Sequence, residues 1–287
     1  MKSPILALLF PLLAFPALQD QAQPVRTQLI PEVLSIQPGK PFCVAVRLQM
    51  EEGWHTYWKN PGDSGLATTI QWKLSPGFSA GEIQWPYPDA FRLGPEVNYG
   101  YDEEVWLLTE IRPPSTLKTG TSVSLDATVE WLACLEECLP GRADMLVKLP
   151  VEQEKPEADP LWDEQFKKTR EKIPEPPTAW KVSASAEEDL IRLSLNPSAE
   201  VKIELKGVSF FPEQSELIDY VEPQVLKETD AGFVLELKKS KFFSKWPARI
   251  QGVLFSSEGW GEAHNKPAIR INVKFDRVNS KPKELKK

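Results

Sequence analysis

Residues 123–140 read VSLDATVEWLACLEECLP, a long alternating run followed by two of the three cysteines of the chain. Apolar side chains recur at every second position, at Val123, Leu125, Ala127, Val129 and Trp131. They share one face of an extended strand, because successive side chains of a strand point to opposite sides. The stretch therefore predicts a half-buried β-strand that ends beside a cysteine pair.

The same alternation occurs on both sides of this stretch and predicts an all-β protein. Apolar residues alternate with polar ones in residues 42–50, 70–74, 105–111, 191–195, 201–205, 233–237 and 269–275. Prolines and glycines separate these runs, as is typical of β-sandwich proteins. We expect two immunoglobulin-like β-sandwich domains joined by a linker with a short helix.

The linker is marked by a change of composition, since residues 152–178 are rich in Glu, Lys and Pro. Its helix is expected to be capped by Asp159, to carry Pro160 in its first turn and to end at Pro174. The predicted organisation is a signal peptide at 1–22, a first sandwich at 25–151, the linker at 152–178, a second sandwich at 179–277 and a basic tail at 278–287.

The N-terminal residues indicate export. Lys2 precedes an apolar run at 5–13, which is typical of a secretory signal and shorter than the roughly 20 residues of a membrane span. Cleavage is expected after Ala17 or Ala22, which would leave a soluble exported protein. The net charge of −7 argues against nucleic-acid binding, which requires a concentrated basic surface.

The spacing of Cys134 and Cys138 requires the chain to turn between them. In a straight strand they would lie ~13 Å apart, beyond the ~7 Å limit for a disulfide. Either a hairpin whose loop is residues 135–137 or a helical turn would bring them together. Parity places Cys134 on the face opposite Ala133, which favours an accessible site. The spacing leaves redox exchange, a structural disulfide and metal binding open.

Four motifs in order resemble the N-terminal domain of the DsbD/ScsB thiol:disulfide interchange proteins. They are GWHTYWKNPGDSG at 53–65, IQWP at 83–86, NYGY at 98–101 and WLACLEECLP at 131–140. The resemblance covers roughly residues 30–151, and the second sandwich is more loosely similar to the second β domain of ScsB-like members. The three residues between the cysteines are also similar to the ScsB-like branch.

The resemblance implies a periplasmic domain that accepts electrons from a membrane-embedded partner through a thioredoxin-like domain. It would pass them to oxidised periplasmic proteins without a cofactor, in a family connected with cytochrome c biogenesis. The chain has three cysteines and no Cys-x-x-Cys pair. We therefore expect a separate membrane thiol:disulfide reductase and thioredoxin-like proteins as partners.

The resemblance also implies roles for individual residues. Cys138 matches the cysteine that forms the mixed disulfide with partners, and Cys134 the one that resolves it. His55 and Tyr57 match positions that flank the pair. Residues 97–101 match the cap loop that shields it, where Asn98 replaces an aromatic residue, so that Tyr99 or Tyr101 would have to cover the site.

The same residues are compatible with other functions. His55, Cys134 and Cys138 have the chemistry of a Cu(I) or Zn(II) site, although three ligands at irregular spacing are a weak metal motif. A hydrolase is disfavoured because no nucleophile motif accompanies the two histidines, His55 and His264. A non-catalytic exported binding module with a structural disulfide is the remaining alternative, so whether the protein is an enzyme stays open. Cys43 is expected to act as a small apolar side chain.

Overall fold

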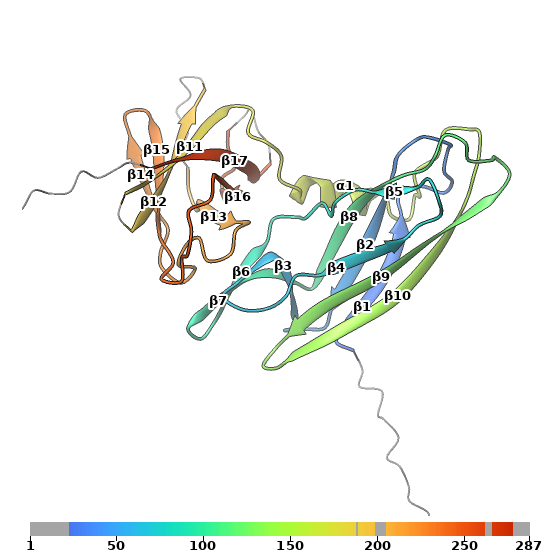
Figure 1. Cartoon of the computed structure of the whole chain (residues 1–287), viewed down its shortest axis with the longest axis horizontal. Coiled ribbons are helices and arrows are strands. Elements are labelled where there is room, and N and C mark those ends of the chain that lie inside the picture. Colours follow the sequence, from blue (N-terminus) through green and yellow to red (C-terminus); the bar gives the residue numbers. More distant parts are fainter. Residues whose placement is uncertain (1–22, 188, 199–204, 262–265, 278–287) are drawn as a thin grey trace, which may run out of the picture.

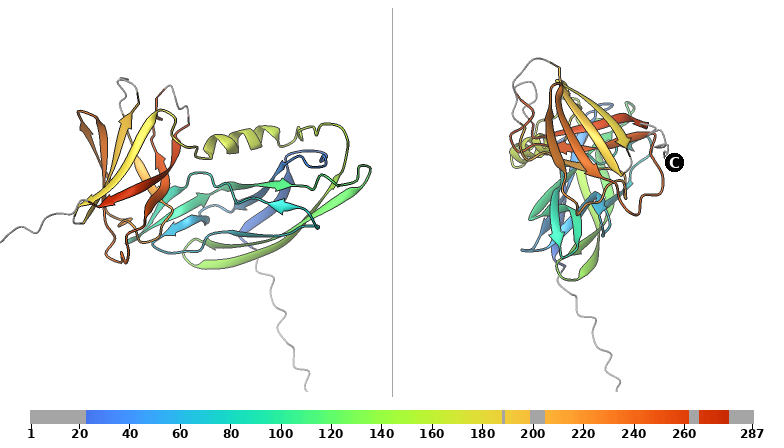
Figure 2. Two further views of the ribbon diagram at one scale, coloured as in Figure 1. Left: turned by 45° about the horizontal axis from the view of Figure 1, so that its top comes forward. Right: turned by 90° about the vertical axis from the view of Figure 1, so that its left-hand side faces the viewer.

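The structure is a computed structural model that describes residues 23–187, 189–198, 205–261 and 266–277. It consists of two β-sandwich domains joined by a segment that contains a short helix (Figures 1 and 2). The predicted fold class is therefore confirmed. Within the described residues, no helix has the length and apolarity that crossing a bilayer requires.

Two antiparallel sheets form the first domain. One contains, in spatial order, β1 (Val25–Pro31), β2 (Phe42–Met50), β8 (Glu104–Arg112) and β5 (Ser79–Ala80). The other contains β10 (Cys138–Pro150), β9 (Ser122–Cys134), β3 (His55–Gly62), β7 (Glu96–Asp102) and β6 (Asp89–Leu93), with β4 (Thr69–Lys73) paired to β9. Both cysteines of the pair thus stand at one end of the second sheet.

The alternating side chains identified in the sequence form the core between these sheets. Val46 and Leu48 of β2 are fully buried against Leu107 of β8. Val129 and Trp131 of β9 face them from the second sheet and belong to the same cluster. The period-2 pattern therefore assigned the inward face of β2, β8 and β9 correctly.

The helix α1 (Asp163–Lys172) begins later than the sequence predicted. Asp159 and Pro160 form a turn before it, in which the Asp159 carboxylate accepts a hydrogen bond of 2.9 Å from the Leu161 amide. The helix N-cap is Trp162, which makes no side-chain capping bond. The prediction that Asp159 caps the helix is wrong, because its carboxylate is used by the preceding turn.

This helix covers the outer face of the β1–β2–β8 sheet rather than spanning solvent between the domains. Phe166 is fully buried there against Trp106, with Cys43 and Ala45 in the same cluster. Burial raises the pKa of the Cys43 thiol to about 12, so this free cysteine is an apolar packing group. Arg170 anchors the helix through two hydrogen bonds, of 2.5 and 2.7 Å, to Glu32.

In the described part of the second domain, seven strands surround a separate core. They are β11 (Trp180–Glu187), β12 (Leu190–Pro197), β13 (Ser209–Pro212), β14 (Val225–Thr229), β15 (Gly232–Lys238), β16 (Arg249–Phe255) and β17 (Ala268–Arg277). Two antiparallel groups, β13–β16–β17 and β11–β12–β15–β14, are joined by a short parallel pairing of β11 with β17. Of the predicted run at 201–205, residues 201–204 lie outside the described residues, and Leu205 is buried.

The two domains share an apolar contact next to strands β3 and β7. Phe211 of β13 packs edge-on against Tyr99, with ring centroids 5.0 Å apart, and also approaches Trp58. Asn60 of β3 donates a hydrogen bond of 2.7 Å to the carbonyl of Pro212 and lies 3.2 Å from the hydroxyl of Tyr220. The core of the first domain thus continues into the second domain.

Replacing Phe211 by alanine tests this connection. We expect a loss of about 3 kcal/mol of unfolding free energy, because a buried aromatic is removed from between the domains. Urea unfolding should then separate into two transitions. The matched control is Phe210→Ala, which removes the neighbouring ring from the core of the second domain. Phe210→Ala should lower the unfolding free energy of the second domain alone. If both variants lower the unfolding free energy of both domains equally, the prediction is contradicted.

Candidate functional site

The cysteine pair closes the tip of the hairpin formed by β9 and β10. Cys134 and Cys138 are directly opposite each other in the register, with Cα atoms 4.1 Å apart, and their sulfur atoms form a disulfide. Residues 135–137 form the connecting loop and are exposed. Of the two local structures that the spacing allowed, the hairpin is therefore confirmed.

The two sulfur-bearing residues differ sharply in exposure. Cys138 is exposed, whereas Cys134 is 3% exposed. The expectation that parity makes Cys134 accessible is wrong. Cys134 does point away from the sandwich core that contains Ala133, but the side chains of β3 cover it on that second face. A partner can therefore approach the pair from the side of Cys138.

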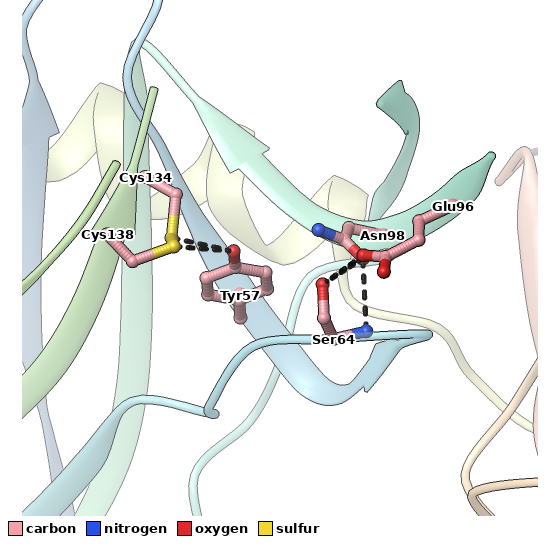
Figure 3. Close-up of a disulfide and its surroundings, with 6 residues drawn as sticks. All are labelled: Tyr57, Ser64, Glu96, Asn98, Cys134 and Cys138. Carbon is pink, nitrogen blue, oxygen red and sulfur yellow. Dashed lines mark hydrogen bonds between the residues drawn. A yellow bond between two sulfur atoms is a disulfide. The ribbon is translucent and has the colours of Figure 1, made fainter. Parts of the chain in front are cut away.

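Tyr57 contacts both sulfur atoms from the middle of β3. Its hydroxyl donates a hydrogen bond of 2.8 Å to Sγ of Cys134 and lies 3.9 Å from Sγ of Cys138 (Figure 3). The side chain is 1% exposed. Burial, with a smaller contribution from the charge of Glu96, raises the pKa of Tyr57, so the hydroxyl keeps its proton and remains a donor.

His55 lies next to the disulfide, opposite Cys134 across the β3–β9 pairing. Its ring stacks on Phe91 and meets Tyr57 edge-on, with centroid distances of 5.2 Å in both contacts. Burial lowers the pKa of His55, although the nearby charge of Asp102 and a hydrogen bond with the Cys134 backbone act in the opposite direction. Its Nε2 atom is buried without a hydrogen-bond partner, which also favours the neutral ring.

A short loop, residues 62–65, begins at the last residue of β3 and covers Tyr57. Gly65 has φ of +108°, and a Cβ added there would lie 2.2 Å from the Tyr57 ring, so the backbone rests directly on the ring. The Ser64 hydroxyl is within hydrogen-bonding distance of Asn98, at 3.2 Å, and of Glu96, at 2.7 Å (Figure 3). Asp63 accepts a hydrogen bond of 2.8 Å from the Val97 amide. These bonds fasten the loop to the start of β7.

The segment predicted as a cap loop, residues 97–101, is part of strand β7. It pairs with β3 on one side and with β6 on the other. The Tyr99 ring contacts Phe211 and Tyr220 of the second domain, and the Tyr101 hydroxyl donates a hydrogen bond of 2.8 Å to the Pro86 carbonyl. Both tyrosines are therefore held in packing contacts. Strands β6 and β7 form a hairpin, and its aromatic side chain that reaches the site is Phe91, which stacks on His55.

Metal binding finds no support in the donor arrangement. Over the described ranges, no group of three or more His, Cys, Asp or Glu side chains is placed to hold an ion. His264, the second histidine, lies outside those ranges.

Residues 20–150 match the family model of the N-terminal domain of the thiol:disulfide interchange protein DsbD. This range contains the whole of the first domain, which is therefore similar to DsbD N-terminal domains. The family expected from the sequence motifs is thus confirmed. No curated protein matches the chain.

Among solved structures, the N-terminal periplasmic domain of ScsB from Proteus mirabilis is similar with a TM-score of 0.58 and 16% identity. The match covers 88% of this chain and 92% of that one, so the shared fold includes both sandwiches. The DsbD N-terminal domain of Neisseria meningitidis in its reduced form is 17% identical over 42% of this chain and 83% of that one, with a TM-score of 0.24.

Phe91 and the loop at 62–65 belong to this candidate site, and the sequence alone did not indicate their place in it. A signal for Phe91 was present, because Gly94 and Pro95 mark a turn between two short segments. Recognising that hairpin would have placed Phe91 opposite Asn98, on the strand next to the predicted cap.

Replacing Gly65 by alanine tests whether the loop controls access to the disulfide. The new Cβ must displace the Tyr57 ring, so we expect faster reduction by dithiothreitol and a stability loss above the ~1–2 kcal/mol cost of the backbone conformation. Gly94→Ala is the matched control, since Gly94 also has positive φ, +60°, but nothing lies within 4 Å of its added Cβ. Similar rates for both variants would refute the role of the loop.

The lowered pKa of His55 predicts a stability that depends on pH. In the unfolded chain His55 takes up a proton below about pH 6.5, whereas in the folded domain it resists protonation. The contribution of neutral His55 to the free energy of unfolding is therefore present above pH 6.5. It is lost as the pH falls toward the lowered pKa of the folded state. Urea unfolding should show this loss between about pH 7.5 and 5.5 in the wild type. This loss of unfolding free energy should be smaller in His55→Phe. If the free energy of unfolding of that variant depends on pH as steeply as that of the wild type, His55 is not the cause.

Proposed function

We propose that this protein is a periplasmic thiol-disulfide exchange module that works through Cys134 and Cys138. The observation that carries the proposal is the unequal exposure of the pair, with Cys138 exposed and Cys134 buried beside it. Exchange needs one sulfur that a partner can reach and a second that remains close enough to resolve the mixed disulfide. The similarity of the first domain to DsbD N-terminal domains supports the same conclusion.

In the proposed cycle, a dithiol of a separate membrane reductase, or of a thioredoxin-like protein that it reduces, first reduces Cys134–Cys138. Two electrons and two protons pass to the pair, and the donor becomes a disulfide. The Cys138 thiolate then attacks a disulfide of an oxidised exported protein, which forms a mixed disulfide and releases one thiolate of that protein. Cys134 attacks Sγ of Cys138, which restores the original disulfide and releases the second thiolate.

Tyr57 is placed to assist both states of this cycle. Its protonated hydroxyl can donate to the Cys134 sulfur in the disulfide and to a Cys134 thiolate after reduction. A hydrogen bond to the thiolate lowers its pKa and so increases the fraction ready to resolve the mixed disulfide. Tyr57 acts here as a positioning residue and transfers no proton.

The remaining site residues shape and shield the pair. His55 covers Cys134 as a neutral ring, and Asn98 holds the loop that presses on Tyr57. Tyr99 and Tyr101 contribute indirectly, because their packing fixes the strand that carries Asn98. On this proposal they set the shape of the surface against which a partner docks.

Two single-cysteine variants test the order of attack. Reduced Cys134→Ala should react with oxidised glutathione or an aromatic disulfide through Cys138 and accumulate a stable mixed disulfide. Cys138→Ala keeps the buried Cys134 and should react at least about tenfold more slowly, because access of the thiolate limits exchange. Equal rates for the two variants would contradict the assigned roles.

The reduction potential decides between exchange and the structural alternative. Equilibration of the wild type with a thiol redox buffer should give a potential above about −300 mV, whereas a structural disulfide lies below that value. A lower potential would leave an exported scaffold whose disulfide is structural, and the exchange function would have to be abandoned.

A further inference from the structure

The loop between β15 and β16 of the second domain concentrates positive charge in an otherwise acidic protein. Residues 238–249, which we call the lysine-aromatic loop, read KKSKFFSKWPAR and contain five cations and no acidic residue. The chain as a whole carries a net charge of −7. The proposed disulfide exchange does not explain this local positive charge, because the disulfide lies in the other domain.

Three aromatic rings give this loop a fixed base. Phe243 and Trp246 have centroids 4.4 Å apart, and Trp246 stacks on Phe275 of β17 at 4.6 Å. All three rings are partly buried against the core of the second domain. Phe242, by contrast, is 66% exposed, and it is the one aromatic among the exposed large apolar side chains of the described residues. The loop therefore presents an aromatic ring to solvent from a packed support.

Among the described residues, only part of the positive charge of the loop is paired with a carboxylate. Asp189 forms ion pairs with Lys238 and Lys239, at 3.7 and 3.2 Å. Lys241 lies over the Phe242 ring at 5.3 Å, and both Lys241 and Lys245 are exposed. Arg249 and Lys274, opposite each other in the β16–β17 pairing, are also exposed, and the Arg249 guanidinium bonds Asn272.

We propose that the lysine-aromatic loop docks the protein on the surface of an anionic phospholipid bilayer. Lysines near an anionic membrane contribute additively to adsorption, and an exposed aromatic ring inserts at the level of the headgroups. Protein–protein interfaces, by contrast, are depleted in lysine and enriched in arginine and tyrosine. With four lysines among its five cations, the loop fits a lipid surface better than an acidic protein partner.

The position of the loop leaves the domain contact undisturbed. Phe242, Lys241 and Lys245 of the loop are exposed, and Phe255, at the end of β16 farther from the loop, contacts Tyr87 of the first domain at 5.2 Å. Adsorption through Phe242 and the lysines therefore requires no separation of the domains. The inference does not depend on the exchange function, since no cysteine takes part in it.

Vesicle co-sedimentation of the full chain tests the proposal. The wild type should bind phosphatidylcholine vesicles that contain phosphatidylglycerol at about 0.1 M salt, and release them near 1 M salt, where charges are screened. The double variant Lys241→Gln/Lys245→Gln should bind roughly 25-fold more weakly, at about fivefold per lysine. Phe242→Ser should weaken binding roughly tenfold, because a buried phenyl ring is lost.

Matched controls separate the loop from general surface charge. Lys118→Gln/Lys155→Gln removes two exposed lysines from the rest of the chain, and Leu146→Ser removes a side chain that is 55% exposed. Both should bind as the wild type does, and all variants keep the same terminal segments. Equal losses in the controls, or no wild-type binding to anionic vesicles, would overturn the proposal. It would also be overturned if soluble polyglutamate bound as tightly as vesicles and Phe242→Ser had no effect, since the surface would then serve an acidic protein.

Discussion

The register of the β9–β10 hairpin is the constraint on which the site depends. Thirteen residue pairs align these two strands, and the last of them joins Cys134 to Cys138. Trp131 and Gly141 are opposite each other, and a Cβ on Gly141 would lie 2.2 Å from the indole. A slip of β10 by one residue would move Gly141 away from Trp131 and turn Cys138 to the face opposite Cys134. Packing of one tryptophan therefore helps to hold the two sulfur atoms together.

The second domain supports the strands that cover the disulfide. Its residues 211–221 contact Asn60 and Lys59 of β3, and they contact Arg92 and Tyr99 of the β6–β7 hairpin. These are the same elements that carry Tyr57 and His55 beside the cysteine pair and Phe91 on the His55 ring. The cover of the site is thus fixed from two sides, by the core of its own domain and by the neighbouring domain. The second domain therefore contacts two of the strands on which the candidate site is built.

The sequence predicted the parts of this structure that depend on local pattern. Alternation identified the inward faces of β2, β8 and β9, and the spacing of Cys134 and Cys138 restricted the chain to a tight turn. The prediction that Cys134 is accessible was wrong. Alternation along a strand tells which face of the sheet a side chain occupies, but it does not tell what covers that face. The packing of Tyr99 against Phe211 was equally inaccessible to local pattern, since 112 residues of sequence separate the two rings. The prediction that Asp159 caps the helix failed for a different reason. The same carboxylate can serve a turn or a helix cap, and the turn uses it here.

The small size of the disulfide loop bears on its function. By the loop-entropy argument, a bridge between residues four apart contributes only about 2 kcal/mol to stability. Reduction therefore removes little of the folding free energy. The hydrogen bonds between β9 and β10 and the contacts of Tyr57 and His55 do not require the bond between the sulfur atoms. The same scaffold can then hold the pair as a disulfide and as a dithiol, with one sulfur covered and the other open to solvent. A couple that cycles needs two states of similar structure, and this arrangement supplies them more readily than a disulfide that ties distant strands.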